Sequence, residues 1–235
     1  MMQFRRLASQ IDARLVWFCG GLLSIDLLFI LVHSVHEIYI FFYNDNAAML
    51  DNRWNIERDR SYAEIFGYIK TLIILSSLIS IQRQWGCPIY LALIMIFAFA
   101  LLDDAFQVHE LLGVGIADAL ALQSFAGLRA RDVGELIVWM VAGVSLLAVA
   151  LAAFVRSPQA DRTNGLLLMG AFALLVLFAV VADMVHVVVR ATFQGADLLF
   201  TVIEDGGEQI TLTLTCGIAA LIRREVRSRE PRYPA

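Results

Sequence analysis

The chain has 235 residues, of which 60% are hydrophobic and 17% are charged, and its mean hydropathy is +0.72. A soluble domain of this size rarely reaches such values, and several apolar runs have the roughly 20 residues that cross a bilayer. The formal charge is −4, and the sequence has neither a basic face nor a stretch in which aromatic and basic residues alternate. These features argue against a nucleic-acid-binding protein. We therefore expect an all-α, polytopic membrane helical bundle that forms a single transmembrane domain over residues 1–235.

Six predicted membrane helices follow one another along the chain. They cover residues 15–42, 62–83, 88–112, 132–155, 164–190 and 198–222. Pro88 opens the third span, a position where its missing N–H group costs nothing. The segment 113–131 is apolar but too short to cross the membrane, so it predicts an interfacial or re-entrant helix.

The arginines are distributed unequally between the two sides of these spans. When alternate connections are assigned to opposite sides, eleven arginines fall on one side and six on the other. Cytoplasmic loops of membrane proteins carry an excess of basic residues. The sequence therefore predicts a multi-pass protein of a bacterial-type inner membrane, with both termini in the cytoplasm.

Three pairs of helices share one sequence pattern. Each odd-numbered span carries a Val-His pair near its outer end, and each even-numbered span carries a glutamate in its outer half. These residues are His36, His109, His186, Glu64, Glu135 and Glu208. In addition, "FALLDD" ending at Asp104 is matched by "FAVVAD" ending at Asp183. The pattern predicts three degenerate helical hairpins, each contributing one histidine and one glutamate.

These polar residues predict a metal site. Ionisable groups inside apolar runs are costly unless they are paired or solvated, so they are functional candidates. If three hairpins pack around one axis, the imidazoles and carboxylates converge at similar depth. The predicted metal ligands are His36, His109, His186, Glu64, Glu135, Glu208, Asp104 and Asp183. This ligand type, which ferritin-like di-metal proteins also use, suits iron or zinc, with manganese a weaker candidate. His33 is instead expected to be an ordinary polar residue at the membrane interface.

The sequence favours a metal-dependent membrane enzyme with its site in the outer half of the bilayer. The expected substrate is lipid-like or otherwise hydrophobic, and the chemistry is that of an oxidoreductase or a hydrolase. Two alternatives stay open. Asp26, Lys70 and Glu208 would suit a proton- or ion-coupled transporter. The chain would also suit an accessory subunit of a membrane complex, with haem or a pigment as a lesser alternative cofactor. The expected partners are membrane lipids and either a complex partner or a second copy of the chain.

Overall fold

The structure is a computed structural model that describes residues 6–43, 51–190 and 197–229. Its elements in chain order are α2 (Ala13–Tyr43), the short 3-10 helix η1 (Asn52–Trp54), α3 (Tyr62–Trp85), α4 (Pro88–Phe106), α5 (Val108–Ala119), α6 (Ala130–Arg156), α7 (Gln159–Val176), the π-helical segment η2 (Leu177–Ala182), α8 (Asp183–Arg190) and α9 (Asp197–Ser228). No β-strand occurs among the described residues. The expected all-α membrane bundle is therefore confirmed.

Among the described residues, five helices are long and apolar enough to cross a membrane. They are Ala13–Tyr43, Tyr62–Trp85, Pro88–Phe106, Ala130–Arg156 and Gln159–Arg190. The sixth predicted span corresponds to α9, which has 32 residues but is less apolar. α9 packs against α2, α3, α7, η2 and α8. Because these neighbours shield α9 from lipid, its buried face can carry threonines and glutamine without the cost of exposing them to hydrocarbon.

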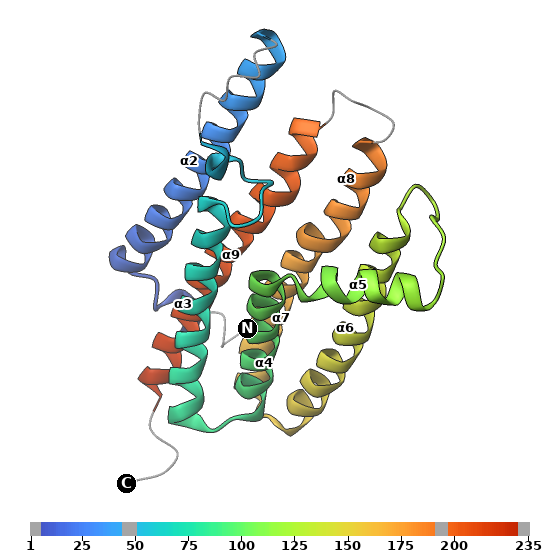
Figure 1. The fold of residues 1–235 in the computed structure, drawn as a ribbon. Coiled ribbons are helices and arrows are strands. Elements are labelled where there is room, and N and C mark those ends of the chain that lie inside the picture. The colour runs from blue at the N-terminus through green and yellow to red at the C-terminus, as the bar shows by residue number, and fades with distance from the viewer. Residues whose placement is uncertain (1–5, 44–50, 191–196, 230–235) are drawn as a thin grey trace.

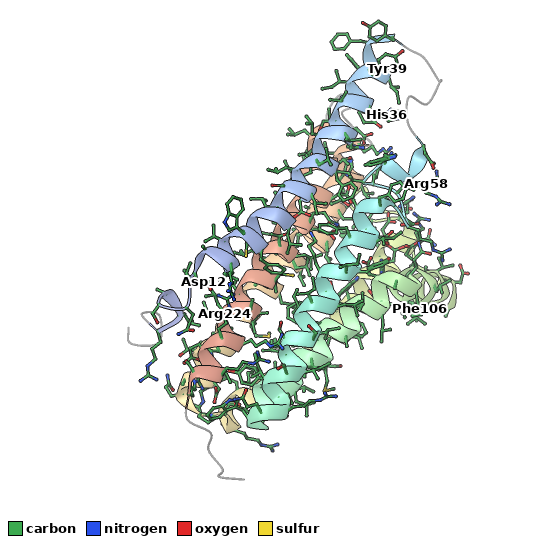
Figure 2. The ribbon with its side chains drawn as sticks, turned by 90° about the vertical axis from the view of Figure 1, so that its left-hand side faces the viewer. Asp12, His36, Tyr39, Arg58, Phe106 and Arg224 are labelled. Atoms are coloured by element: carbon green, nitrogen blue, oxygen red, sulfur yellow. The ribbon has the colours of Figure 1, made fainter. Side chains whose placement is uncertain are left out.

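The helices run in alternating directions, so the bundle has two distinct ends (Figure 1). We call the end where α3 and α9 begin the upper end, and the opposite end the lower end. α2 begins and α9 finishes at the lower end, where Arg224 donates a hydrogen bond of 2.5 Å to Asp12 (Figure 2). Both described ends of the chain therefore lie on the same side of the bundle.

The boundaries of α3 and α4 follow from local sequence. Ser61 caps α3, and its hydroxyl accepts a hydrogen bond of 3.1 Å from the backbone N–H of Glu64. Gly86 ends α3 in the left-handed conformation at φ 59°, which glycine adopts without strain. Pro88 then occupies the first turn of α4, as its position in the sequence predicts.

The third predicted span, 88–112, is divided in the structure. Gln107 has φ 52° and separates α4 from α5, which runs sideways from the upper end of α4 and packs against α6 (Figure 1). Asp103 stabilises this break because its carboxylate accepts the backbone N–H of His109 at 2.9 Å. The helix expected within 113–131 therefore begins earlier, at Val108, and ends at Ala119.

The three predicted hairpins are not packed in the same way. α4 contacts α6 and α7 contacts α9, but α2 packs chiefly on α9 rather than on α3. The threefold repeat stays a prediction from the sequence pattern.

Candidate functional site

A cavity of about 280 Å³ opens at the upper end of the bundle between α3, α4, α5, η2 and α9. Its wall includes a large set of carboxylates from the helices and from the segment before α3. They are Glu57, Asp59, Glu64, Asp103, Asp104, Glu110, Asp183, Glu204, Asp205 and Glu208. The basic side chains of the lining are Arg58 and His109 alone. The cavity is therefore strongly acidic.

The other part of the cavity is apolar, and the two parts lie at different depths. On α4, Phe97 and Leu101 come before Asp103, and this helix rises toward the upper end. On α9, which descends, Leu212 lies one helical turn below Glu208. Trp139 and Phe172, from α6 and α7, add aromatic surface. The acids thus occupy the upper level, and the apolar side chains form the inner level.

Two residues of α9 that line the cavity have buried oxygen atoms for which the described residues offer no hydrogen-bond partner. Gln209 is only 8% exposed, and its Oε1 atom has no partner within residues 6–43, 51–190 and 197–229. The Oδ2 atom of Asp205 is likewise buried and has no hydrogen-bond partner within these ranges. Native proteins pair nearly all buried polar atoms, so such atoms point to an absent partner such as a water or an ion.

The π-helical segment η2 directs Asp183 into the cavity. It replaces a regular helical turn between α7 and α8, and Ala179 within it lines the wall. Phe178 of the same segment lies against Gly207, where an added Cβ would come within 2.4 Å of the ring. A glycine at this position therefore permits the close approach of η2 to α9. Single π-helical turns occur frequently at functional sites.

His109 reaches the cavity from α5 through its pairing with Asp103. Its Nδ1 atom lies 2.9 Å from Oδ2 of Asp103, and its ring is 6.0 Å from that of Trp139. Burial lowers the pKa of His109, but the hydrogen bond and charge of Asp103 outweigh it, so the pKa is raised above the usual 6.5. The ion pair fixes the imidazole at the edge of the acidic surface.

Five of the eight predicted ligands line this cavity. They are His109, Glu64, Glu208, Asp104 and Asp183. Glu64 also has a structural role, because it accepts the backbone N–H of Arg60 and, at 2.5 Å, the hydroxyl of Tyr68. Asp104, Asp183 and Glu208 form no side-chain hydrogen bond within the described ranges. These three carboxylates are therefore the free acids of the predicted set.

The other three predicted ligands lie outside the cavity lining. His186 has both ring nitrogens against carboxylates, with Nδ1 at 2.7 Å from Glu204 and Nε2 at 3.0 Å from Asp197. Glu135 lies against Gly113, where α6 meets α5. His36 is in the last turns of α2 (Figure 2). Since each imidazole has different neighbours, convergence of the three histidines on one centre stays a prediction.

The side chains do not form a ready-made metal cage. Among the described residues, no group of three or more His, Cys, Asp or Glu residues could hold a metal ion as they stand. What the cavity offers is a dense set of carboxylate oxygens at its upper level. Such a surface attracts cations and can hold a hard cation through bridging waters as well as directly.

A buried ion pair lies directly beneath the cavity. Lys70 and Asp26 are both 0% exposed, and the ammonium nitrogen of Lys70 lies 2.7 Å from Oδ1 of Asp26. Lys70 also donates a bond of 2.6 Å to the backbone oxygen of Gln209, whose side chain lines the cavity. Thr213 donates a bond of 2.5 Å to the other oxygen of Asp26. Gln209 thus links the acidic cavity to the deeper charged pair.

Residues 61–222 match a protein family described as a domain of unknown function, DUF8692. The chain belongs to this family. The match runs from the N-cap of α3 into α9, so it contains every cavity-lining residue except those at 56–59. α2 lies outside the matched region. No curated protein and no solved structure matches the chain.

The predicted ligand set missed six carboxylates of the cavity wall and the amide of Gln209; the six are Glu57, Asp59, Asp103, Glu110, Glu204 and Asp205. Asp205 and Gln209 are four residues apart, so they share a face of α9. That spacing was available in the sequence. The break at Gln107 and the π-helical turn have no comparable pattern, because each depends on contacts made by other helices.

Proposed function

We propose that the protein is an integral membrane metalloprotein that binds a divalent cation among the carboxylates of its upper cavity. The observation that carries the proposal is the lining itself, in which acids far outnumber Arg58 and His109. Carboxylates crowded into a partly buried space repel one another and lose hydration. A bound cation offsets both costs, and the unpartnered Oε1 atom of Gln209 offers it a neutral oxygen ligand.

The chemistry of the lining favours a hard cation. It is rich in carboxylate oxygens and has one imidazole, from His109. Oxygen ligands suit Mg²⁺, Ca²⁺ or Mn²⁺, whereas a site rich in imidazole suits zinc. Mg²⁺ also keeps several of its waters when it binds, so it does not require all ligand atoms to be gathered in advance. Manganese therefore moves ahead of the iron and zinc that the histidine pattern suggests.

The inner level of the cavity supports a hydrophobic substrate. Phe97, Leu101, Trp139, Phe172 and Leu212 lie below the acids and would surround an apolar chain. A molecule with an apolar body and an oxygen-containing head would place that head at the cation. The cation would polarise the oxygen or lower the pKa of a bound water. This arrangement supports a metal-dependent enzyme that acts on a lipid-like molecule.

The membrane orientation proposed from the arginine distribution determines on which side of the membrane the cavity opens. With both termini in the cytoplasm of a bacterial-type inner membrane, the lower end is cytoplasmic and the cavity opens to the outside. The hydrogen bond between Arg224 and Asp12 supports a common side for the two ends of the described chain.

A cation-coupled transporter is the second candidate, and the pair of Lys70 and Asp26 favours it. Buried ionisable residues within membrane helices often mark ion or proton pathways. This pair lies beneath the cavity and is joined to it through Gln209. Uptake of manganese into liposomes containing the protein, compared with empty liposomes, separates the candidates. A transporter accumulates the ion in the lumen, whereas an enzyme with a blind cavity does not.

The experiment that tests cation binding is a Mn²⁺ titration of the purified full chain in detergent, followed by electron paramagnetic resonance. Glu208→Gln and Asp183→Asn each remove a carboxylate ligand from the cavity wall, so both should lower the affinity by more than about 10-fold. Asp118→Asn is the matched control, because Asp118 is exposed on α5 outside the lining. Wild-type affinity in both cavity variants would contradict the proposal.

A further inference from the structure

His33 is a buried histidine whose ring has no hydrogen-bond partner in the part of the chain that the structure describes. It lies on α2, is 2% exposed, and neither Nδ1 nor Nε2 is paired within the described ranges. A neutral imidazole always has one donor and one acceptor nitrogen. An interfacial histidine would turn at least one of them to water, but here both are buried. Both ring nitrogens are therefore available to bind a ligand such as a metal ion.

His36 continues the same face of α2 one turn later. Its Nδ1 atom is also buried and has no hydrogen-bond partner among the described residues. Residues three or four apart lie side by side on a helix, so His33, His36 and Glu37 share one face. The stretch "HSVHE" thus places two imidazoles and one carboxylate together. Figure 2 shows His36 in the upper part of α2, at the same end of the bundle as Arg58.

Carboxylates from other elements face this pair. The charges that act on His33 come from Glu37 on its own helix, Glu57 before α3, and Asp197 at the start of α9, together with His36. The packing of α2 on α9 explains the presence of Asp197. Ile30 lies against Gly206, and because the helices are antiparallel, the turns after Ile30 meet the turns before Gly206.

Of these two facing acids, Asp197 is the better ligand. Arg190 pairs with both acids, at 2.6 Å from Oε1 of Glu57 and at 3.1 Å from Oδ1 of Asp197, so its charge does not distinguish them. What distinguishes Asp197 is His186, whose Nε2 lies 3.0 Å from the same Oδ1 atom, and within residues 6–43, 51–190 and 197–229 no hydrogen bond reaches Oδ2 of Asp197. Its Oδ2 is thus available to a metal, while His186 holds the carboxylate in place. A hydrogen bond from a neighbouring side chain commonly orients a metal ligand in this way.

We propose that His33 and His36, with Asp197 as the carboxylate, bind a transition-metal ion of the zinc type at a site separate from the acidic cavity. Two imidazoles and a carboxylate match the ligand preference of zinc, and they differ from the oxygen-rich cavity. The ligand atoms are not gathered around one point in this structure. Binding would therefore draw the two rings together by rotation of their side chains.

The test is a zinc titration of the purified full chain, produced without a polyhistidine tag so that no other imidazole cluster is present. His33→Gln and His36→Gln should each lower the zinc affinity by more than about 10-fold, as loss of a ligand exceeds loss of an outer partner. His109→Gln, in the cavity, is the control and should leave zinc binding unchanged. Circular dichroism and size-exclusion chromatography establish whether each variant folds. If His33→Gln does not fold, His36→Gln still tests the proposal, because His36 is only half-buried.

Cu²⁺ used as a probe gives an independent readout. Electron paramagnetic resonance of the copper-loaded protein should show coupling to two imidazole nitrogens, and His36→Gln should reduce it to that of one imidazole or abolish copper binding at this site. Zinc affinity equal to wild type in His36→Gln, or copper spectra without nitrogen coupling, would overturn the proposal. The site is distinguishable from the cavity because Glu208→Gln should weaken Mn²⁺ binding and leave zinc binding intact.

Discussion

Lys70 and Asp26 illustrate how single charged residues are tolerated inside an apolar bundle. Each is fully buried, and each has its charge opposed by the other at 2.7 Å. Lys70 also lies 4.9 Å from the ring centroid of Phe66, which adds a cation–π contact. Removal of one partner would leave the other as an unpaired charge in a low-dielectric interior.

We therefore predict that Lys70→Met lowers the free energy of unfolding by about 3–5 kcal/mol. The double variant Asp26→Asn with Lys70→Met should recover much of this loss, because no unpaired charge is left. Denaturant unfolding in detergent micelles measures all three proteins. A double variant that is less stable than Lys70→Met would contradict the proposed cost of leaving Asp26 unpaired.

The ion pair of His109 and Asp103 predicts a pH dependence. The pKa of His109 is raised in the folded protein above its usual 6.5, so its stabilising effect is complete below that value and is lost as the pH rises through the raised pKa. The difference in melting temperature between wild type and His109→Gln should be largest below pH 6.5 and should shrink at alkaline pH. A difference that grows with pH would contradict the protonated pair.

At the scale of helices, a pair of glycines sets the distance between α5 and α6. A Cβ atom at Gly134 would lie 2.1 Å from the backbone oxygen of Gly113, and a Cβ at Gly113 would lie 2.6 Å from Cγ of Glu135. Backbone cannot yield as the end of a side chain can. This contact therefore fixes the position of α5, which carries His109 and Glu110 into the cavity wall.

We predict that Gly134→Ala lowers stability by about 1–3 kcal/mol, as overpacking does, and also weakens Mn²⁺ binding by displacing α5. Gly143→Ala on the same helix is the control, because no atom lies within 4 Å of its added Cβ. Thermal unfolding and the Mn²⁺ titration measure both effects. Equal results for the two variants would show that the close contact does not position α5.

The helical elements were predictable where the sequence alone determines them. Apolar length placed the spans, and Pro88 correctly predicted the start of α4. The break at Gln107 was not predicted, because no glycine or proline marks it and it depends on Asp103 reaching the backbone of His109. The polarity of α9 was also ambiguous in the sequence, since only its central packing explains it.

The sequence predicted the type of residue that forms the candidate site but not the complete set of residues in it. Acids within apolar runs led to Asp104, Asp183 and Glu208, which do line one cavity. The histidine pattern placed His186 among the ligands, but the structure commits both of its nitrogens to carboxylates. Whether a histidine is free to bind a metal depends on which side chains of other helices pair with it. A sequence repeat does not reveal these pairings.

At the scale of the whole molecule, α9 organises the bundle and both ends of the described chain meet at the lower end. The proposed cytoplasmic location of that end predicts the behaviour of a reporter fused to Ala235. A reporter that is active only in the cytoplasm should be active, and one that is active only in the periplasm should be silent. The reverse pattern would place the acidic cavity on the cytoplasmic side.

The central claim is that a divalent cation binds among the cavity carboxylates. The most direct measurement is an anomalous difference map from crystals of the full chain grown with Mn²⁺. We predict a peak in the upper cavity whose nearest protein oxygens, directly or through a bridging water, belong to Glu208 and its neighbours, with direct metal–oxygen distances of about 2.0–2.6 Å. A map from manganese-saturated protein with no peak in the cavity would contradict the account.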